Sequence, residues 1–247
     1  MSTPSRHDEV STEEAAPSRR AWFGLAVLSA GLGMIVLDGT IVGVALPDII
    51  RDLNMNITDA QWVNSLYAVL LAALLLSTGR LSDRWGRKRL FLVGIVIFIG
   101  GSILAAMSDA SGPLIAARAV QAVGAALIMP STLSTVNATF RGKYRATAFG
   151  VWGAVISGAA AIGPLAGGAL TQWGSWEWIF LVNIPLGVIV FVAAIFTVKE
   201  TRGGKALPGA DVDGALLSAI GFGALVFAVI EGPEIGWWVP KADLHIF

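Results

Sequence analysis

Apolar residues follow one another along this chain in long runs that short polar segments separate. About seven of these runs reach or approach roughly 20 residues, which at 1.5 Å rise per residue lets a helix cross a hydrocarbon core of ~30 Å. The predicted spans cover residues 22–46, 62–78, 90–107, 111–140, 146–170, 178–198 and 214–230. The pattern therefore predicts an all-α, polytopic membrane protein.

The polar segments divide the chain into four parts. Residues 1–20 are rich in Ser, Glu, Pro and Arg and are typical of a disordered cytoplasmic tail. Residues 21–198 hold the first six spans, 199–213 form a polar cytoplasmic loop, and 214–247 hold the seventh span and the end of the chain. Because an odd set of helices ends abruptly, we expect the chain to be part of a longer protein.

Local signals predict where several helices begin and end. Pro47 is expected to close the first span, and Pro113 to stand at the start of the fourth, where its missing N–H costs nothing. Thr58 and Gln61 have the spacing of a capping box that opens the second span. Asp213 is expected to cap the seventh.

Composition narrows the possible functions. Hydrophobic residues make up 55% of the chain and charged residues 14%, and the mean hydropathy is +0.72. The formal net charge is zero, so nothing suggests nucleic acid as a partner. The chain has no cysteine, which excludes disulfides, thiolate metal sites and cysteine nucleophiles. Because no cluster of catalytic groups falls at a membrane face, we expect neither an enzyme nor a metal site.

Lysine and arginine are distributed unequally between the two sides of the predicted bundle. If the N-terminus is cytoplasmic, all of the 17 basic residues except Arg51, Arg118 and Lys241 fall in cytoplasmic segments. Basic residues in short loops are retained on the cytoplasmic side. The count therefore predicts a cytoplasmic N-terminus.

A charged segment, residues 79–89, lies between the second and third spans. It holds five basic residues and Asp83, with Gly79 and Gly86 expected to bracket a tight turn because glycine takes positive φ without steric cost. A positive-inside loop between any two helices would need only the basic residues. The fixed spacing of Gly79, Asp83 and Gly86 indicates a defined sequence motif rather than a general basic loop.

Two charges fall inside the predicted spans, where a charged side chain costs several kcal/mol. Asp38 lies about 12 Å from the outer end of the first span, and Arg118 about 8 Å from the outer end of the fourth. Their depths are similar, so the two side chains could meet or face one cavity. A static pair that offsets two desolvation penalties is one reading, and an ion or substrate pathway is the favoured one.

Any proton carried across the membrane must use a carboxylate. The two histidines, His7 and His245, lie near the ends of the chain, outside the predicted spans.

The fifth span has an unusual composition. It is rich in glycine and contains Pro164, which removes the helical hydrogen bond to the backbone oxygen of Ala160. Small residues let helices approach closely in lipid, so a kinked, tightly packed helix is expected.

Four segments resemble motifs of the major facilitator superfamily, in its fourteen-helix drug:proton antiporter branch of the multidrug resistance type. Residues 79–89 resemble the signature between helices 2 and 3, 37–47 the helix 1 motif, 118–124 the helix 4 motif, and 163–168 the antiporter motif of helix 5. The motifs occur in order, and the resemblance covers about residues 20–240. Gly43, Ala122 and Ala159 depart from the usual pattern, and Gly43 replaces an asparagine.

The resemblance implies the N-terminal half of a major facilitator fold. Residues 21–198 would be the six-helix transport domain, and 214–247 would begin with the first of two linker helices. The implied activity is proton-coupled export of amphipathic drugs or other toxic small molecules across a bacterial inner (plasma) membrane by alternating access. It implies a proton gradient as energy source, no cofactor, and a missing C-terminal half of the same transporter as partner.

The resemblance also implies three sets of functional residues. The residues expected to couple proton and substrate are Asp38, Thr40, Arg118 and Gln121. The conformational segment would consist of Gly79, Asp83, Arg84, Gly86, Arg87 and Lys88. The antiporter motif would consist of Gly163, Pro164, Gly167 and Gly168. We hypothesise that Asp38 exchanges a proton for substrate under the control of Arg118, and that loss of Asp83 impairs the change of state more than substrate binding.

Two alternatives stay open at this point. A facilitator of the same fold could import a small solute, although the Gly163-Pro164 pair resembles the antiporter branches and argues against it. The chain could instead be a truncated, transport-incompetent membrane fragment, acting as a partner or scaffold.

Overall fold

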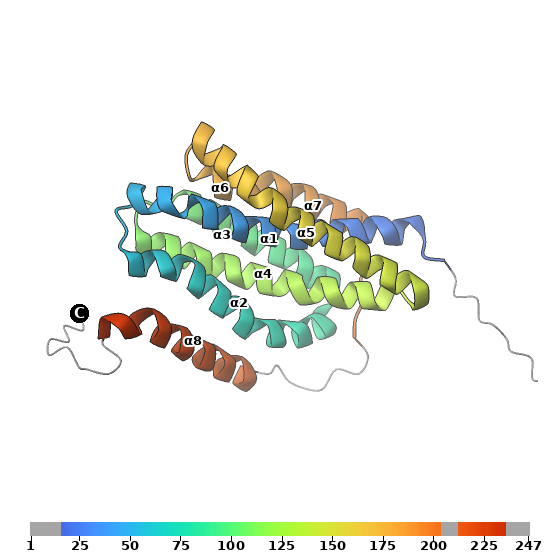
Figure 1. Cartoon of the computed structure of the whole chain (residues 1–247). Coiled ribbons are helices and arrows are strands. Elements are labelled where there is room, and N and C mark those ends of the chain that lie inside the picture. The colour runs from blue at the N-terminus through green and yellow to red at the C-terminus, as the bar shows by residue number, and fades with distance from the viewer. Residues whose placement is uncertain (1–15, 204–211, 236–247) are drawn as a thin grey trace, which may run out of the picture.

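The computed structural model describes residues 16–203 and 212–235, and in this part of the chain every regular element is a helix (Figure 1). The helices are α1 (Arg19–Asp52), α2 (Ile57–Trp85), α3 (Arg87–Ala106), α4 (Ser111–Thr139), α5 (Gly142–Trp173), α6 (Trp178–Leu181), α7 (Asn183–Thr197) and α8 (Val212–Ile235). The predicted all-α fold is confirmed. Most of the predicted tail lies outside the described residues.

Five helical segments are long and apolar enough to cross a membrane: α1, α3, α4, α5 and the combined α6 and α7, Trp178–Thr197. Helix α2 makes a sixth if its two parts, Ile57–Leu75 and Ser77–Trp85, form one span bent by 53°. The seventh predicted span falls on α8, which is helical but is not one of these six.

The long helices lie side by side in one bundle (Figure 1). The most extensive packing joins α3 to α4, α1 to α5 and α2 to α4, while α8 lies along α2 at the edge of the bundle (Figure 1). Large apolar side chains remain exposed on the outer helices, such as Val96 on α3, Leu165 on α5 and Phe196 on α7. Such a surface suits a lipid environment, in which exposed apolar groups carry no hydrophobic penalty.

Apolar clusters form the interior, and the two larger ones occupy different stretches of α1. One contains Leu28, Leu32 and Ile35 together with residues of α3, α4 and α7. The other contains Ile41, Val42 and further residues toward the end of α1 and the start of α4. Residue 38 falls between these two stretches of α1, so the polar groups around it are enclosed between two apolar clusters.

The interface between α3 and α4 depends on glycine. A Cβ atom on Gly124 would come within 2.6 Å of the backbone nitrogen of Phe98 and 2.7 Å of the backbone oxygen of Gly94. A Cβ on Gly101 would come within 2.7 Å of the backbone nitrogen of Gln121. Because backbone cannot move aside as a flexible side chain can, this close approach excludes any larger residue.

Several predicted helix ends are wrong because helical backbone hydrogen bonding extends beyond the apolar runs from which the ends were predicted. Pro47 lies inside α1, which continues to Asp52 before Asn54 takes a positive φ of 48°. The cap of α2 is Asn56, whose side chain accepts a hydrogen bond from the backbone of Asp59, and not the predicted Thr58 and Gln61 box. Asp213 is the second residue of α8 rather than its cap.

The charged segment 79–89 is also mostly helical rather than a loop. Gly79 lies inside α2, whose last residue is Trp85, and α3 begins at Arg87. Only Gly86 separates the two helices, with φ at +110°. The expectation of a turn bracketed by two glycines is therefore right for Gly86 and wrong for Gly79.

We predict that Gly124→Ala lowers the free energy of unfolding by about 1–3 kcal/mol, because the added methyl group forces α3 and α4 apart. The matched control is Gly100→Ala on α3, where an added Cβ meets no atom within 4 Å. Unfolding of the detergent-solubilised variants by a denaturing detergent measures both. Equal stability of the two variants would contradict the proposed contact.

Candidate functional site

The two charges predicted inside the spans form an ion pair. Asp38 on α1 and Arg118 on α4 are buried, with exposed side-chain fractions of 0% and 1%. The Nη1 atom of Arg118 lies 2.5 Å from Oδ2 of Asp38. Helix α1 contacts α4, and the pair shows that both side chains lie at the same level of the bundle.

Gln121, one turn after Arg118 on α4, binds both members of the pair. Its Oε1 accepts a hydrogen bond from Nη1 of Arg118 at 2.9 Å, and its Nε2 donates to Oδ1 of Asp38 at 3.2 Å. The same Nε2 donates to the hydroxyl of Ser102 on α3 at 2.8 Å. The structure thus brings together three of the four residues expected to couple proton and substrate.

Asn183, the first residue of α7, belongs to the site although the sequence analysis did not single it out. Its Nδ2 donates to Oδ1 of Asp38 at 2.6 Å and to Ser102 at 3.3 Å. Its Oδ1 is buried and has no hydrogen-bond partner among the described residues. The sequence does contain a sign of this role, because Asn183 is a polar amide within an otherwise apolar stretch of the sixth predicted span.

The guanidinium of Arg118 also packs against α2. Its Cζ lies 4.1 Å from the ring centroid of Tyr67, a cation–π contact. Its Nε is 3.5 Å from the backbone oxygen of Val63. Residues of α1, α2, α3, α4 and α7 therefore surround one carboxylate and one guanidinium.

Both oxygens of the Asp38 carboxylate accept hydrogen bonds from other helices. Oδ2 accepts from Arg118, and Oδ1 accepts from Gln121 and Asn183. A buried ion pair offsets the cost of its desolvation only when further hydrogen bonds satisfy its remaining polar atoms. The amides of Gln121 and Asn183 meet this condition for the carboxylate.

Thr40, the fourth residue expected in this group, lies outside the hydrogen-bonded network. Its hydroxyl donates to the backbone oxygens of Val36 at 3.1 Å and Leu37 at 2.9 Å within α1. On its outer side Thr40 packs against Gly163 of α5, where an added Cβ would collide with the threonine hydroxyl.

The antiporter motif divides into two faces of α5. Gly163 and Gly167 are buried and face α1, and a Cβ on Gly167 would come within 3.2 Å of the backbone oxygen of Ile41. Pro164 is exposed, and Gly168 has open space where a Cβ would stand. The first pair lets α5 approach α1 beside Thr40, while the second faces away from it.

Asp83 and Arg87 join the ends of α2 and α3 to α4. Oδ1 of Asp83 accepts hydrogen bonds from Nε and Nη2 of Arg87 at 3.0 and 2.8 Å. Nη1 of Arg87 donates to the backbone oxygen of Ser134 on α4 at 2.9 Å. Arg84, by contrast, is exposed.

Lys88 and Gly86 contact the end of α7 and the segment that follows it. Nζ of Lys88 donates to the backbone oxygen of Ile195 at 2.6 Å, and its backbone N–H donates to Oε1 of Glu200 at 3.1 Å. The Glu200 carboxylate lies so close to Gly86 that an added Cβ would come within 2.6 Å of it. The end of a glutamate side chain can move aside, so the requirement for glycine at position 86 is set mainly by its positive φ.

Membrane-length helices packed around a buried ion pair define a multi-pass membrane protein. The sequence matches the profile of the Major Facilitator Superfamily over residues 28–240. The chain therefore belongs to the Major Facilitator Superfamily.

Curated relatives include several resistance proteins. The puromycin resistance protein pur8 of Streptomyces alboniger is 41% identical over 239 residues, which cover 94% of this chain and 46% of the relative. The methylenomycin A resistance protein of Bacillus subtilis is 39% identical over 217 residues, 87% of this chain and 46% of the relative. The chain spans less than half the length of these relatives.

A solved structure supports the fold. A bacterial homologue of the human lysosomal transporter Spinster, in an inward-facing and occupied conformation, matches with a TM-score of 0.67 at 19% identity. The match covers 78% of this chain and 47% of that chain. The described bundle thus has the fold of one part of a major facilitator transporter.

We predict that Asp38→Asn lowers the free energy of unfolding by about 3–5 kcal/mol, because it leaves the Arg118 guanidinium buried without its counter-charge. The double variant Asp38→Asn/Arg118→Met is expected to be more stable than Asp38→Asn alone. Detergent-induced unfolding of the single and double variants measures the coupling. Additive losses would contradict a direct interaction.

For α5, Gly163→Ala is expected to lower the free energy of unfolding by about 1–3 kcal/mol, because its methyl group would displace Thr40 and separate α5 from α1. Gly168→Ala, on the open side of the same helix, is the matched control and is expected to be neutral or slightly stabilising. Thermal unfolding in detergent compares the two. A loss of similar size in the control would show that α5 resists alanine for another reason.

Proposed function

We propose that this chain forms the N-terminal part of a proton-coupled antiporter that exports amphipathic drugs or similar toxic small molecules across a bacterial plasma membrane. Support comes from the family and from relatives named for resistance to puromycin and methylenomycin A. The excess of lysine and arginine in alternate loops supports a cytoplasmic N-terminus.

The observation that carries the proposal is the buried Asp38–Arg118 pair with its amide partners. The Asp38 carboxylate is fully buried, paired and hydrogen-bonded within a membrane-spanning helix. Ionisable residues at such positions are energetically costly, and they usually mark the pathway of an ion or a substrate. Among the described residues no other carboxylate is fully buried. Asp38 is therefore the residue to which we assign proton transfer.

The proposed cycle uses competition for the Asp38 carboxylate. In the described state Arg118 donates to Oδ2 of Asp38. When the bundle rocks and α1 shifts relative to α4, Arg118 withdraws and a proton from the outer side binds the carboxylate in its place. Return to the described state restores the pair and releases the proton toward the cytoplasm, where substrate then binds. The next outward step carries that substrate out.

Asn183 is suited to both charge states of the acid. Its Nδ2 donates to the ionised carboxylate, and its unpaired Oδ1 can accept a hydrogen bond from the protonated acid after the amide rotates. We assign Asn183 the role of a positioning residue that holds Asp38 in place while Arg118 comes and goes.

The Asp83–Arg87 contact is proposed to hold one conformational state. Arg87 ties the α2–α3 junction to the backbone of α4 through Ser134, and α4 carries Arg118. Movement of this junction therefore pulls directly on the helix that bears the guanidinium. Loss of Asp83 would change the balance between states more than substrate binding.

The proposal is tested by uphill efflux of a fluorescent cationic dye from cells that express the full-length product of the gene encoding this chain. We expect Asp38→Asn to reduce proton-driven efflux to background while the protein still reaches the membrane. Asp48→Asn is the matched control on the same helix, because Asp48 pairs with Arg51 at the exposed end of α1 and is expected to retain efflux.

Normal efflux by Asp38→Asn would overturn the assignment of the proton to this carboxylate. Equal loss in Asp38→Asn and Asp48→Asn would indicate a folding defect of α1 rather than a coupling defect. Amounts of each variant in the membrane fraction separate these outcomes.

A further inference from the structure

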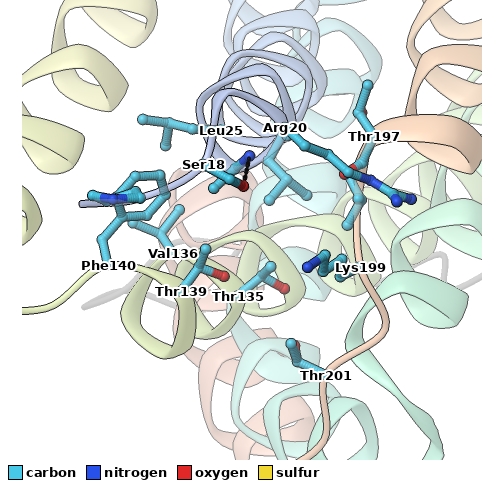
Figure 2. A pocket seen from close by; sticks show the side chains of 15 residues that line it. Ser18, Arg20, Leu25, Thr135, Val136, Thr139, Phe140, Thr197, Lys199 and Thr201 are labelled. Atoms are coloured by element: carbon cyan, nitrogen blue, oxygen red, sulfur yellow. Dashed lines mark hydrogen bonds between the residues drawn. The ribbon is translucent and has the colours of Figure 1, made fainter. Parts of the chain in front are cut away.

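A cavity of about 320 Å³, seen from close by in Figure 2, is lined by residues from the start of α1, far along that helix from Asp38. It opens where α1 begins and where α4 and α7 end, which is the end that the proposed orientation places in the cytoplasm. Its polar lining residues are Ser18, Arg20, Thr135, Thr139, Thr197, Lys199 and Thr201. A volume of this size is in the range of small-ligand sites.

The charged lining of the cavity is entirely positive. Arg20 and Lys199 line it, and no aspartate or glutamate does among the described residues. Lys199 makes no hydrogen bond or ion pair within the described part of the chain. Glu200, its neighbour in sequence, turns away to the backbone of Lys88 and to Arg89.

Hydrogen-bond donors in the cavity are also left free. Nε of Arg20 donates to the backbone oxygen of Thr197 at 3.4 Å, which leaves its two terminal nitrogens available. The Ser18 oxygen accepts from the backbone of Ala21, so its own O–H can donate to a ligand. The hydroxyl oxygen of Thr201 is buried and has no partner among the described residues.

The partial charges of the helix ends reduce the positive charge around the cavity but do not reverse its sign. The start of α1 adds a partial positive charge, and the ends of α4 and α7 add partial negative charges, each of about half an elementary charge. Two full cations outweigh the net contribution of these ends. The other walls are apolar and include Leu25, Val136 and Phe140 (Figure 2).

We propose that this cavity binds a phosphate group, carried either by the headgroup of an anionic phospholipid or by a small soluble phosphate ester. A tetrahedral oxyanion accepts several hydrogen bonds at once, which matches a lining with two cations and free hydroxyls. Basic pockets between membrane helices on the cytoplasmic side suit lipid headgroups, and the apolar walls would accommodate the adjoining glycerol or acyl carbons.

Occupation of the cavity would act on the Asp83–Arg87 junction. Thr201 lines the cavity, and its backbone oxygen accepts a hydrogen bond from the backbone N–H of Arg87 at 3.0 Å. Two residues later, the N–H of Gly203 donates to the backbone oxygen of Asp83 at 3.1 Å. A phosphate held by Lys199 and Thr201 would therefore order the segment that braces this junction.

The test measures binding to the purified chain directly. Native mass spectrometry compares retention of phosphatidylglycerol with that of zwitterionic phosphatidylcholine, and calorimetry measures binding of glycerol 3-phosphate. We expect the double variant Arg20→Gln/Lys199→Gln to weaken binding of the anionic ligand by at least about tenfold. Thr201→Val, which removes only the buried hydroxyl, is expected to weaken it about fivefold.

The matched control is Lys143→Gln/Arg145→Gln, which removes the same charge from exposed positions at the start of α5 outside the cavity. Retained binding by this control supports the cavity as the binding site. Equal weakening in both double variants would show only a general attraction of anions to the basic cytoplasmic side of the protein and would overturn the proposal.

The two ligands distinguish the source of the phosphate group. Retention of phosphatidylglycerol without binding of glycerol 3-phosphate assigns the phosphate to lipid, and the reverse assigns it to a soluble ester. Binding of neither overturns the proposal.

Discussion

The burial of two opposite charges between α1 and α4 is the constraint on which the rest of this bundle depends. Removing a carboxylate and a guanidinium from water costs several kcal/mol for each ion, and only a close pair with further hydrogen bonds offsets that cost. The close pair needs α1 and α4 at a fixed distance. The additional hydrogen bonds need α3 and α7 in contact with them, because Ser102 and Asn183 complete the network.

Glycine supplies the close helix contacts that this arrangement needs. Gly124 and Gly101 let α3 approach α4 on one side of Gln121, and Gly163 lets α5 approach α1 on the outer side of Thr40. In lipid, where burial of apolar surface does not drive helices together, such contacts are a main source of packing energy. The glycines thus hold the helices that carry the ion pair close together.

The sequence predicted the helices and the charged pair because both produce strong, local signals: long apolar runs, and two charges at similar depths within them. The helix ends that it predicted at Pro47, Thr58 and Gly79 are wrong, because backbone hydrogen bonding continues through residues whose polarity suggests a loop. Asn183 was not predicted, because burying a neutral amide in a membrane costs less free energy than burying a charge, so an amide is a weaker sign of function. Thr40 lies two residues after Asp38 on α1, and side chains with this spacing face different sides of a helix, so helical periodicity already separates them.

Substrate-induced proton release distinguishes a proton-carrying Asp38 from a purely structural one. The full-length protein, in weakly buffered detergent solution with a pH-sensitive dye, receives a transported cation, and the protons released are counted. We expect release from the wild-type protein and none from Asp38→Asn, with substrate still bound by both. Release of the same number of protons from Asp38→Asn would contradict this expectation and would make the Asp38–Arg118 pair a structural feature only.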